Sequence, residues 1–211
     1  MTENITVFKH SSILVKTGAG AVYIDPFQMD GAPHDAAIVL VTHDHYDHFS
    51  KDDIEKVCGR DTVLVVPEKM AATANEVSAH VKEIKTVVPG KHYEVKGLEF
   101  ETVASYNVDK PFHPKNAGWV GYVLITDGQR IYIAGDTDAT REAESVKCDI
   151  ALVPVGGTYT MDAKQAAGLV NTIRPKIAIP VHYGSAVGKP SDGADFARLV
   201  KGDVKVEIKI G

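Results

Sequence analysis

The sequence predicts an α/β protein that folds as a four-layer αββα sandwich, with two facing sheets and helices on both outer faces. Three observations lead to this prediction. Segments typical of strands come first and helical patterns follow, and the same order is repeated in the second half of the chain. The strand patterns are short apolar runs rich in β-branched residues. No linker rich in proline, glycine or serine divides the 211 residues, so we expect one domain over residues 1–211.

The first half of the chain is predicted to supply one sheet and two helices. Its strands are expected at residues 5–9, 13–16, 21–25, 36–41, 62–66 and 84–88. Ser50 is a predicted helix N-cap with Asp53 at the third helical position, and Gly59 is predicted to end that helix. A second helix is expected to begin at Pro67 and to continue to about residue 80.

The second half repeats this order. Its strands are expected within residues 93–104 as a hairpin, and at 119–126, 130–134, 150–155, 177–181 and 204–210. Helices are expected at about 138–146, 162–173 and 192–200. Residues 105–118 form an irregular segment with two prolines and His113. Because long loops inside compact domains are usually functional, we expect this segment to contribute to a site.

Composition excludes several classes of protein. Hydrophobic residues make up 44% and charged residues 24% of the chain, as in a soluble globular protein. The net charge of −5, without a run of lysine or arginine, argues against a nucleic-acid partner. The polar start predicts neither a secretory signal nor a membrane span, so we expect a cytoplasmic protein. Cys58 and Cys148 are too few for a disulfide framework or a thiolate zinc site.

Residues 42–48, reading Thr-His-Asp-His-Tyr-Asp-His, concentrate possible metal ligands directly after the apolar run 36–41. Such groups must be paired if they are buried, whereas neutral imidazole and carboxylate oxygen are ligands of zinc, manganese and iron. His43 and His45 are two positions apart, so they project to the same side of an extended loop. Asp47 and His48 follow a bend and can reach a second point nearby. This segment therefore predicts a metal site at the end of a strand.

Two later strand ends carry similar groups. Asp136 follows the apolar run 131–133, with Gly135 allowing a tight turn before it. His182 directly follows the predicted strand 177–181. An acid after a glycine, or a histidine after a strand, is equally typical of an ordinary turn. These positions become candidate ligands because they accompany the first motif.

The pattern His43-x-His45-x-Asp47-His48 resembles that of the metallo-β-lactamase superfamily. The resemblance covers nearly the whole chain and is closest to the branch of ascorbate-phosphate-lactonase-like proteins and metal-dependent hydrolases. It implies the metallo-β-lactamase fold and a hydrolase that uses a metal-activated hydroxide on a small-molecule ester, phosphodiester or lactone bond. It also implies one or two divalent ions per chain, with Zn²⁺ or Mn²⁺ expected and iron as an alternative.

The resemblance implies a role for each candidate ligand. His43 and His45 would hold one metal, Asp47 and His48 the second, and Asp136 would bridge the two. His182 would complete the second site. Asp47 and Asp136 would also fix the metals and orient the hydroxide, so we treat both as catalytic candidates.

The chain departs from this branch at one position. The branch carries a histidine two residues after the alanine that ends the hairpin, and alignment on Ala104 puts Tyr106 there, followed by Asn107. His113, between two prolines, is a candidate for the missing ligand and for a catalytic role, or it contacts substrate. The remaining option is a first metal site with one protein ligand fewer. Such a site is compatible with a mononuclear iron oxygenase, which is an alternative function. A metal-binding protein without catalysis is the other competing class.

Further side chains are candidates for orienting the ligands or lining the pocket. His10 and Asp25 both follow predicted strands, Lys115 could receive an anionic substrate, and Tyr183 could protonate a leaving group. We expect a small-molecule substrate, with an anionic one as an option, and no nucleic acid or membrane partner. A homo-oligomer is left open.

Overall fold

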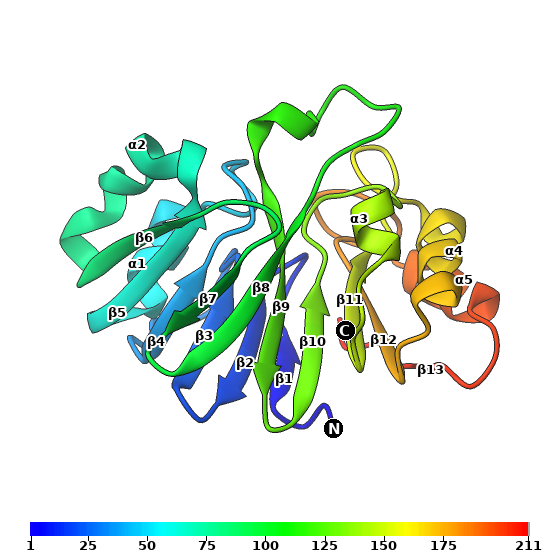
Figure 1. Cartoon of the computed structure of the whole chain (residues 1–211), viewed down its shortest axis with the longest axis horizontal. Coiled ribbons are helices and arrows are strands. Elements are labelled where there is room, and N and C mark those ends of the chain that lie inside the picture. Colours follow the sequence, from blue (N-terminus) through cyan, green and yellow to red (C-terminus); the bar gives the residue numbers. More distant parts are fainter. Residues whose placement is uncertain (211) are drawn as a thin grey trace.

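A computed structural model describes residues 1–210 and contains two facing sheets with helices on both outer sides. Figure 1 shows the four layers in section, with α1 and α2 beside one sheet and α3, α4 and α5 beside the other. The predicted αββα sandwich is thereby confirmed.

The first sheet has six strands in the order of the sequence. They are β1 (Ile5–Val7), β2 (Ile13–Thr17), β3 (Gly20–Ile24), β4 (Ala36–Leu40), β5 (Cys58–Pro67) and β6 (Glu83–Val87). Strands β1 to β3 are antiparallel, and β3 to β6 are parallel. The parallel part places the carboxyl ends of β3 and β4 at the same edge, where the metal-ligand motif begins.

The second sheet has seven strands in the order β13-β12-β11-β10-β9-β8-β7. They are β7 (His92–Val95), β8 (Leu98–Ala104), β9 (Val120–Thr126), β10 (Gln129–Ile133), β11 (Ile150–Pro154), β12 (Ile177–Val181) and β13 (Lys205–Val206). Strands β7 to β10 are antiparallel, and β10 to β13 are parallel. The antiparallel-then-parallel pattern repeats that of the first sheet, which agrees with the repeated order of strands and helices predicted from the sequence.

Apolar side chains fill three interfaces between the four layers. Residues such as Leu40 of β4 and Phe100 of β8 meet between the sheets. Ile54 of α1 packs on the outer face of the first sheet, and Leu169 of α4 and Phe196 of α5 on that of the second. Burying each such side chain stabilises the fold by about 1.5–3 kcal/mol. The packed layers therefore fix the strand ends from which the candidate ligand loops leave.

The α-helices are α1 (Lys51–Val57), α2 (Ala71–Ala74), α3 (Arg141–Glu144), α4 (Ala163–Ile173) and α5 (Asp192–Leu199). The short 3₁₀ helices are η1 (Glu68–Met70), η2 (Asn75–His80) and η3 (Lys115–Ala117). The side chain of Ser50 accepts a hydrogen bond from the Asp53 backbone N–H, which confirms the predicted start of α1. Asp162 and Gln165 cap α4 reciprocally in a capping box.

Several predicted boundaries were wrong. Helix α1 ends at Val57, and Gly59 lies inside β5, where a Cβ atom would come within 2.8 Å of the His34 carbonyl oxygen. Close approach of two backbones, rather than a helix end, therefore explains this glycine. The helix expected over 67–80 is divided into η1, α2 and η2. The last strand is limited to β13, and the helix expected at 138–146 is limited to α3.

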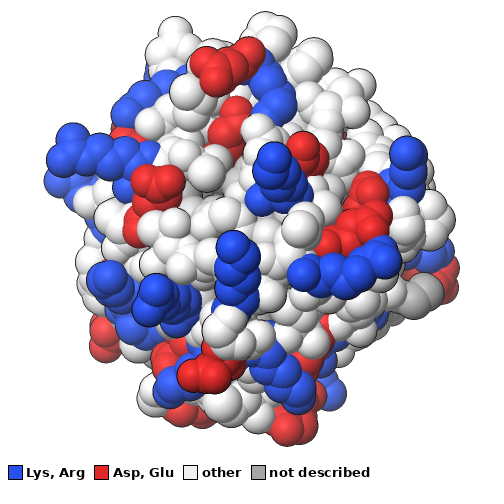
Figure 2. Space-filling view, turned by 90° about the vertical axis from the view of Figure 1, so that its right-hand side faces the viewer, with Lys and Arg blue, Asp and Glu red and all other residues white. Residues whose placement is uncertain are grey.

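Within residues 1–210, no helix is long and apolar enough to cross a bilayer. Figure 2 shows the side of the molecule that lies to the right in Figure 1. Basic and acidic side chains are interspersed over that face, with uncharged surface between them.

Candidate metal centre

The candidate ligands lie in loops that follow strand ends at one edge of the sandwich. His43, His45, Asp47 and His48 follow β4, Asp136 follows β10, and His182 follows β12. Gly135 has a φ of +65°, a left-handed conformation that turns the chain just before Asp136. His113 comes from the loop between β8 and β9, which lies at the top of Figure 1. Parallel strands thus bring residues from distant parts of the chain together.

The side chains form two groups of possible ligands, and a third set, His43, His48 and Asp136, spans the two. One group contains His43, His45 and His113, and the other contains Asp47, His48, His182 and His10. Within each group the ligand atoms lie within 4.8 Å of one another. Most of these side chains are buried, but His45 is partly exposed. The two groups match, residue by residue, the two metal positions that the sequence motif implied, with His10 and His113 in addition.

Asp136 lies between the two groups. Its Oδ2 atom is 3.0 Å from His182 Nε2 and 3.3 Å from His113 Nε2. Its Oδ1 atom is 3.3 Å from His48 Nε2. Only 4% of this residue is exposed. A carboxylate in this position can reach a cation in either group.

Asp25 orients His48. Its Oδ2 atom accepts a hydrogen bond of 2.7 Å from His48 Nδ1–H, and it also accepts from the Thr42 hydroxyl at 2.7 Å. The Thr42 backbone N–H donates to the other oxygen of Asp25 at 2.8 Å. Because an ionised carboxylate only accepts, the Nδ1 atom of His48 donates to Asp25, which directs its Nε2 atom at the site.

Asn107 orients His113 in the same way. Its Oδ1 atom accepts hydrogen bonds from the backbone N–H and the ring Nδ1–H of His113, at 3.0 and 2.9 Å. Its Nδ2 atom donates to the Tyr159 carbonyl at 2.9 Å, which sets the orientation of the amide. This leaves His113 Nε2 facing Asp136, 3.3 Å from its Oδ2 atom. The sequence placed Asn107 in the pocket region, and this hydrogen-bonding role depends on loop folding that its position alone does not reveal.

The buried acceptors of this centre fit a cation. Within the described chain, His48 Nε2, His113 Nε2, His182 Nε2 and Asp136 Oδ1 have no hydrogen-bond partner. Imidazole nitrogens here face carboxylate oxygens, and leaving such buried polar groups unpaired is costly. A divalent metal satisfies both kinds of atom. Imidazole nitrogen with carboxylate oxygen is a donor set suited to zinc, manganese and iron.

The electrostatics also suit metal binding. Burial lowers the pKa of His43 well below its usual value and lowers that of His45, so both imidazoles stay neutral. Burial also lowers the pKa of His48, but the carboxylates of Asp136 and Asp25 outweigh it and raise that pKa above its usual range. Without a metal, a proton on His48 therefore takes the place of the cation. Metal binding must displace this proton.

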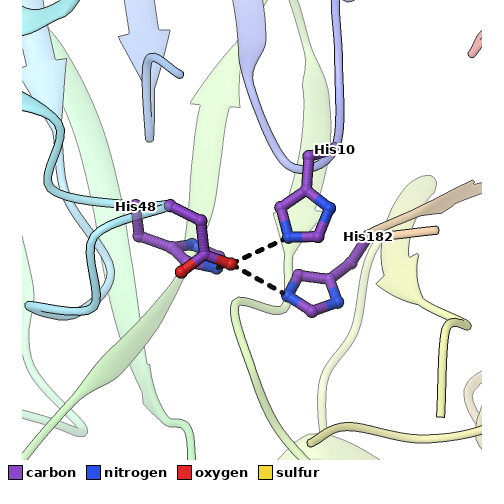
Figure 3. Close-up of side chains that lie close together, drawn as sticks. His10, His48 and His182 are labelled. Carbon is purple, nitrogen blue, oxygen red and sulfur yellow. Dashed lines mark hydrogen bonds and ion pairs between the residues drawn. The ribbon is translucent and has the colours of Figure 1, made fainter. Parts of the chain in front are cut away.

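His10 completes the second group. Its Nε2 atom lies 2.9 Å from Asp47 Oδ2, and its ring centroid is 3.8 Å from that of His182. Figure 3 shows the rings of His10, His48 and His182 converging on one point from three separate segments. Burial raises the pKa of Asp47, but the hydrogen bond to His10 and the nearby His182 ring outweigh burial and lower that pKa below its usual value, so the carboxyl group is ionised at neutral pH.

Three pocket candidates lie elsewhere. The Tyr106 hydroxyl donates to Glu142 at 2.8 Å, and Lys115 Nζ lies 2.6 Å from the same carboxylate and over the Tyr106 ring. Both side chains therefore contact α3 rather than the histidines. Tyr183 is buried against Gly193 of α5, where any Cβ atom would clash with its ring. None of these three residues lines the pocket beside the histidines, because ion pairing and packing hold them against α3 and α5.

Trp119 lies beside the first group, although the sequence favoured packing on the hairpin over a place in the pocket wall for this residue. Its ring centroid lies 5.0 Å from those of His43 and His45 and 5.5 Å from that of His113, so it forms a wall of the first group. Its location directly before β9, at the end of the long loop, was the available signal.

Comparison with known proteins agrees with this geometry. A family model described as "Beta-lactamase superfamily domain" matches residues 4–182. A UPF0173 metal-dependent hydrolase of Nitratidesulfovibrio vulgaris is 35% identical over 201 residues, which cover 88% of this chain and 82% of the relative. A second UPF0173 metal-dependent hydrolase, from Methanopyrus kandleri, is 33% identical, and the alignment covers 97% of this chain and 95% of the relative. The crystal structure of a metal-dependent hydrolase from Parabacteroides distasonis superimposes with a TM-score of 0.81 at 28% identity, covering 98% and 93% of the two chains.

The fold, the ligand loops and these relatives define a class of protein. The chain belongs to the metallo-β-lactamase superfamily, as the motif at residues 43–48 predicted. Within that superfamily it is a metal-dependent hydrolase of the branch that contains the UPF0173 relatives.

Proposed function

We propose that this hydrolase binds two divalent metal ions, Zn²⁺ or Mn²⁺, and cleaves an ester, phosphodiester or lactone bond of a small molecule. His43, His45 and His113 would hold one ion, and Asp47, His48 and His182 the other. The observation that supports this proposal most strongly is the position of Asp136. Its two oxygens lie 3.0–3.3 Å from histidines of both groups, which suits a carboxylate shared by two cations.

When bound, two such metals would lower the pKa of a shared water to about 7 and polarise the substrate. The residues of the chain would prepare the site for that chemistry. Asp25 and Asn107 hold His48 and His113 in the required tautomers. Asp47 is ionised, and it lines the pocket together with Asp136. Both carboxylates can therefore orient a water next to the substrate.

The position of His113 helps to distinguish the two-metal hydrolase from the competing iron oxygenase. That alternative arose because a tyrosine stands where the branch usually has a histidine. His113 brings a third imidazole to the first group, within 4.8 Å of the ligand atoms of His43 and His45. A complete set of three imidazoles beside a shared carboxylate supports the two-metal hydrolytic centre.

Metal reconstitution tests the proposal. The purified protein would be stripped with a chelator and reloaded with Zn²⁺, Mn²⁺ or Fe²⁺, and hydrolysis of bis(4-nitrophenyl) phosphate, 4-nitrophenyl acetate and a γ-lactone would be measured. We expect turnover only after Zn²⁺ or Mn²⁺ is restored. His43→Ala should abolish it, whereas His80→Ala, a partly exposed histidine paired with Glu55, should not. A protein that binds two metals but hydrolyses none of the probes would reject the proposal in favour of metal binding without catalysis.

A further inference from the structure

A pocket of about 320 Å³ opens directly above the two ligand groups. Its floor carries polar side chains of the centre, including His45, Asp47 and Asp136. Its walls are apolar or aromatic and consist of Tyr46, Phe112, Tyr159, Ala186 and Val187. This volume is at the lower end of the range for small-molecule sites, which is about 300–1,000 Å³. The pocket therefore suits a small substrate with one polar and one apolar part.

Three aromatic residues form the outer edge of this pocket, and we call Tyr46, Phe112 and Tyr159 the aromatic lip. They are 70%, 41% and 38% exposed, and they account for three of the seven exposed large hydrophobic residues of the described chain. Exposed apolar side chains that gather in one place mark a binding surface more often than scattered ones do. Here they gather at the entrance to the reactive centre.

The aromatic lip is held in place before any substrate arrives. The rings of Phe112 and Tyr159 meet edge to face, with centroids 4.7 Å apart. Asn107, which orients His113, also ties the loop of Phe112 to the Tyr159 carbonyl. Tyr46 packs edge to face on Phe27, at 6.0 Å. A preformed apolar edge can hold a flat group without a large loss of conformational entropy.

The described lining of the pocket offers no cation to a substrate anion. Among residues 1–210, neither lysine nor arginine lines this pocket. The two lysines of the neighbouring loop are already paired, Lys110 with Asp138 and Lys115 with Glu142. An anionic group on the substrate, other than one bound at the metals, would lie next to aromatic rings without a counter-charge.

We propose that the substrate is a small, uncharged carboxylic ester or lactone with an aromatic or similarly flat apolar group that packs against the aromatic lip. This inference rests on the proposed hydrolytic function and narrows its substrate class. Hydrolysis consumes one water, whose oxygen bonds to the acyl carbon as the bond from that carbon to the leaving oxygen breaks. One proton of the water passes to the leaving alkoxide, and the other is released when the product acid ionises.

Binding of two hydroxamic acids tests the aromatic lip without requiring turnover. Phenylacetohydroxamic acid and acetohydroxamic acid share a metal-binding head and differ by a phenyl ring. Calorimetry on the Zn²⁺-loaded protein should find the phenyl compound bound about 10-fold more tightly. In Phe112→Ala/Tyr159→Ala this preference should fall to about 3-fold or less. Val108→Ala, an exposed position of the same loop outside the pocket, should retain it. Equal binding of the two compounds, or an unchanged preference in the double variant with full metal content, would overturn the inference.

Turnover distinguishes failure of this inference from failure of the proposed function. We expect kcat/KM for methyl phenylacetate to exceed that for monomethyl succinate, which carries a charge, by about 10-fold or more. Faster hydrolysis of monomethyl succinate or of bis(4-nitrophenyl) phosphate would overturn the substrate class and leave the hydrolytic function intact. Absence of hydrolysis of all three by the fully loaded protein would reject the proposed function and this inference with it.

Discussion

Replacing His113 with alanine should weaken metal binding at the first group selectively. The residue is 1% exposed, and its Nε2 atom has no hydrogen-bond partner within the described chain. The change would leave His43 and His45 as the remaining imidazoles of that group. The second group, around His48 and His182, would keep all of its side chains.

The expected loss of metal affinity follows from the role of His113 as a ligand. Loss of a residue that merely orients a ligand typically costs roughly 10–100-fold in metal affinity. Removal of the imidazole itself should cost at least as much, because it eliminates the bond and not only its orientation. We therefore expect the first metal to bind at least about 10-fold more weakly, which corresponds to about 1.4 kcal/mol.

The single tryptophan of the chain provides the assay. Trp119 lies about 5 Å from the rings of the first group, so Co²⁺ bound there should quench its fluorescence. Titration of metal-free protein would give the affinity of this group, and elemental analysis would give the total metal content. Tyr106→Phe is the matched control on the same loop, and it should titrate like the unmodified protein because its hydroxyl contacts Glu142. Unchanged affinity in a folded His113→Ala protein would refute the ligand assignment.

Three further predictions concern the same centre. Asp136→Asn should reduce kcat at least about 100-fold with the fold retained, because an amide cannot neutralise two cations, and near-normal turnover with verified metal content would contradict this. Asn107→Leu should lower metal affinity at the first group by roughly 10–100-fold in the Trp119 titration, because His113 loses the acceptor for its Nδ1 proton. A titration like that of the unmodified protein would show that Asn107 is dispensable. Although burial lowers the pKa of His182 as well as that of His48, neighbouring carboxylates raise both, so protons occupy the second group in metal-free protein. Zn²⁺ loading at pH 7 should therefore release protons, and affinity should rise with pH through the neutral range; affinity independent of pH would argue against protonated histidines.

The sequence predicted the parts of the site that depend on local pattern. His43, His45, Asp47 and His48 follow one strand, so their grouping required only the alternation of an extended loop. Asp136 and His182 were identified because each ends a strand, and parallel strands bring such ends to one edge. The two repeated halves followed from the order of strand and helix patterns along the chain.

What the sequence could not predict depends on contacts between loops. His113 and Tyr106 were both candidates, and the choice between their positions is made by Asn107, whose amide contacts His113 and the loop of Tyr159. Lys115 looked available to a substrate but is paired with Glu142 from a helix 27 residues further along the chain. The clustering of Tyr46, Phe112 and Tyr159 likewise requires three loops to meet, and no spacing in the sequence encodes it.

Anomalous diffraction from a crystal grown with Mn²⁺ or Zn²⁺ tests the two-metal centre most directly. We expect two peaks about 3.5–4 Å apart, one among His43, His45 and His113 and the other among Asp47, His48 and His182. Asp136 should lie within bonding distance of both. A single peak at full metal loading, or two peaks without Asp136 between them, would contradict the centre proposed for this hydrolase.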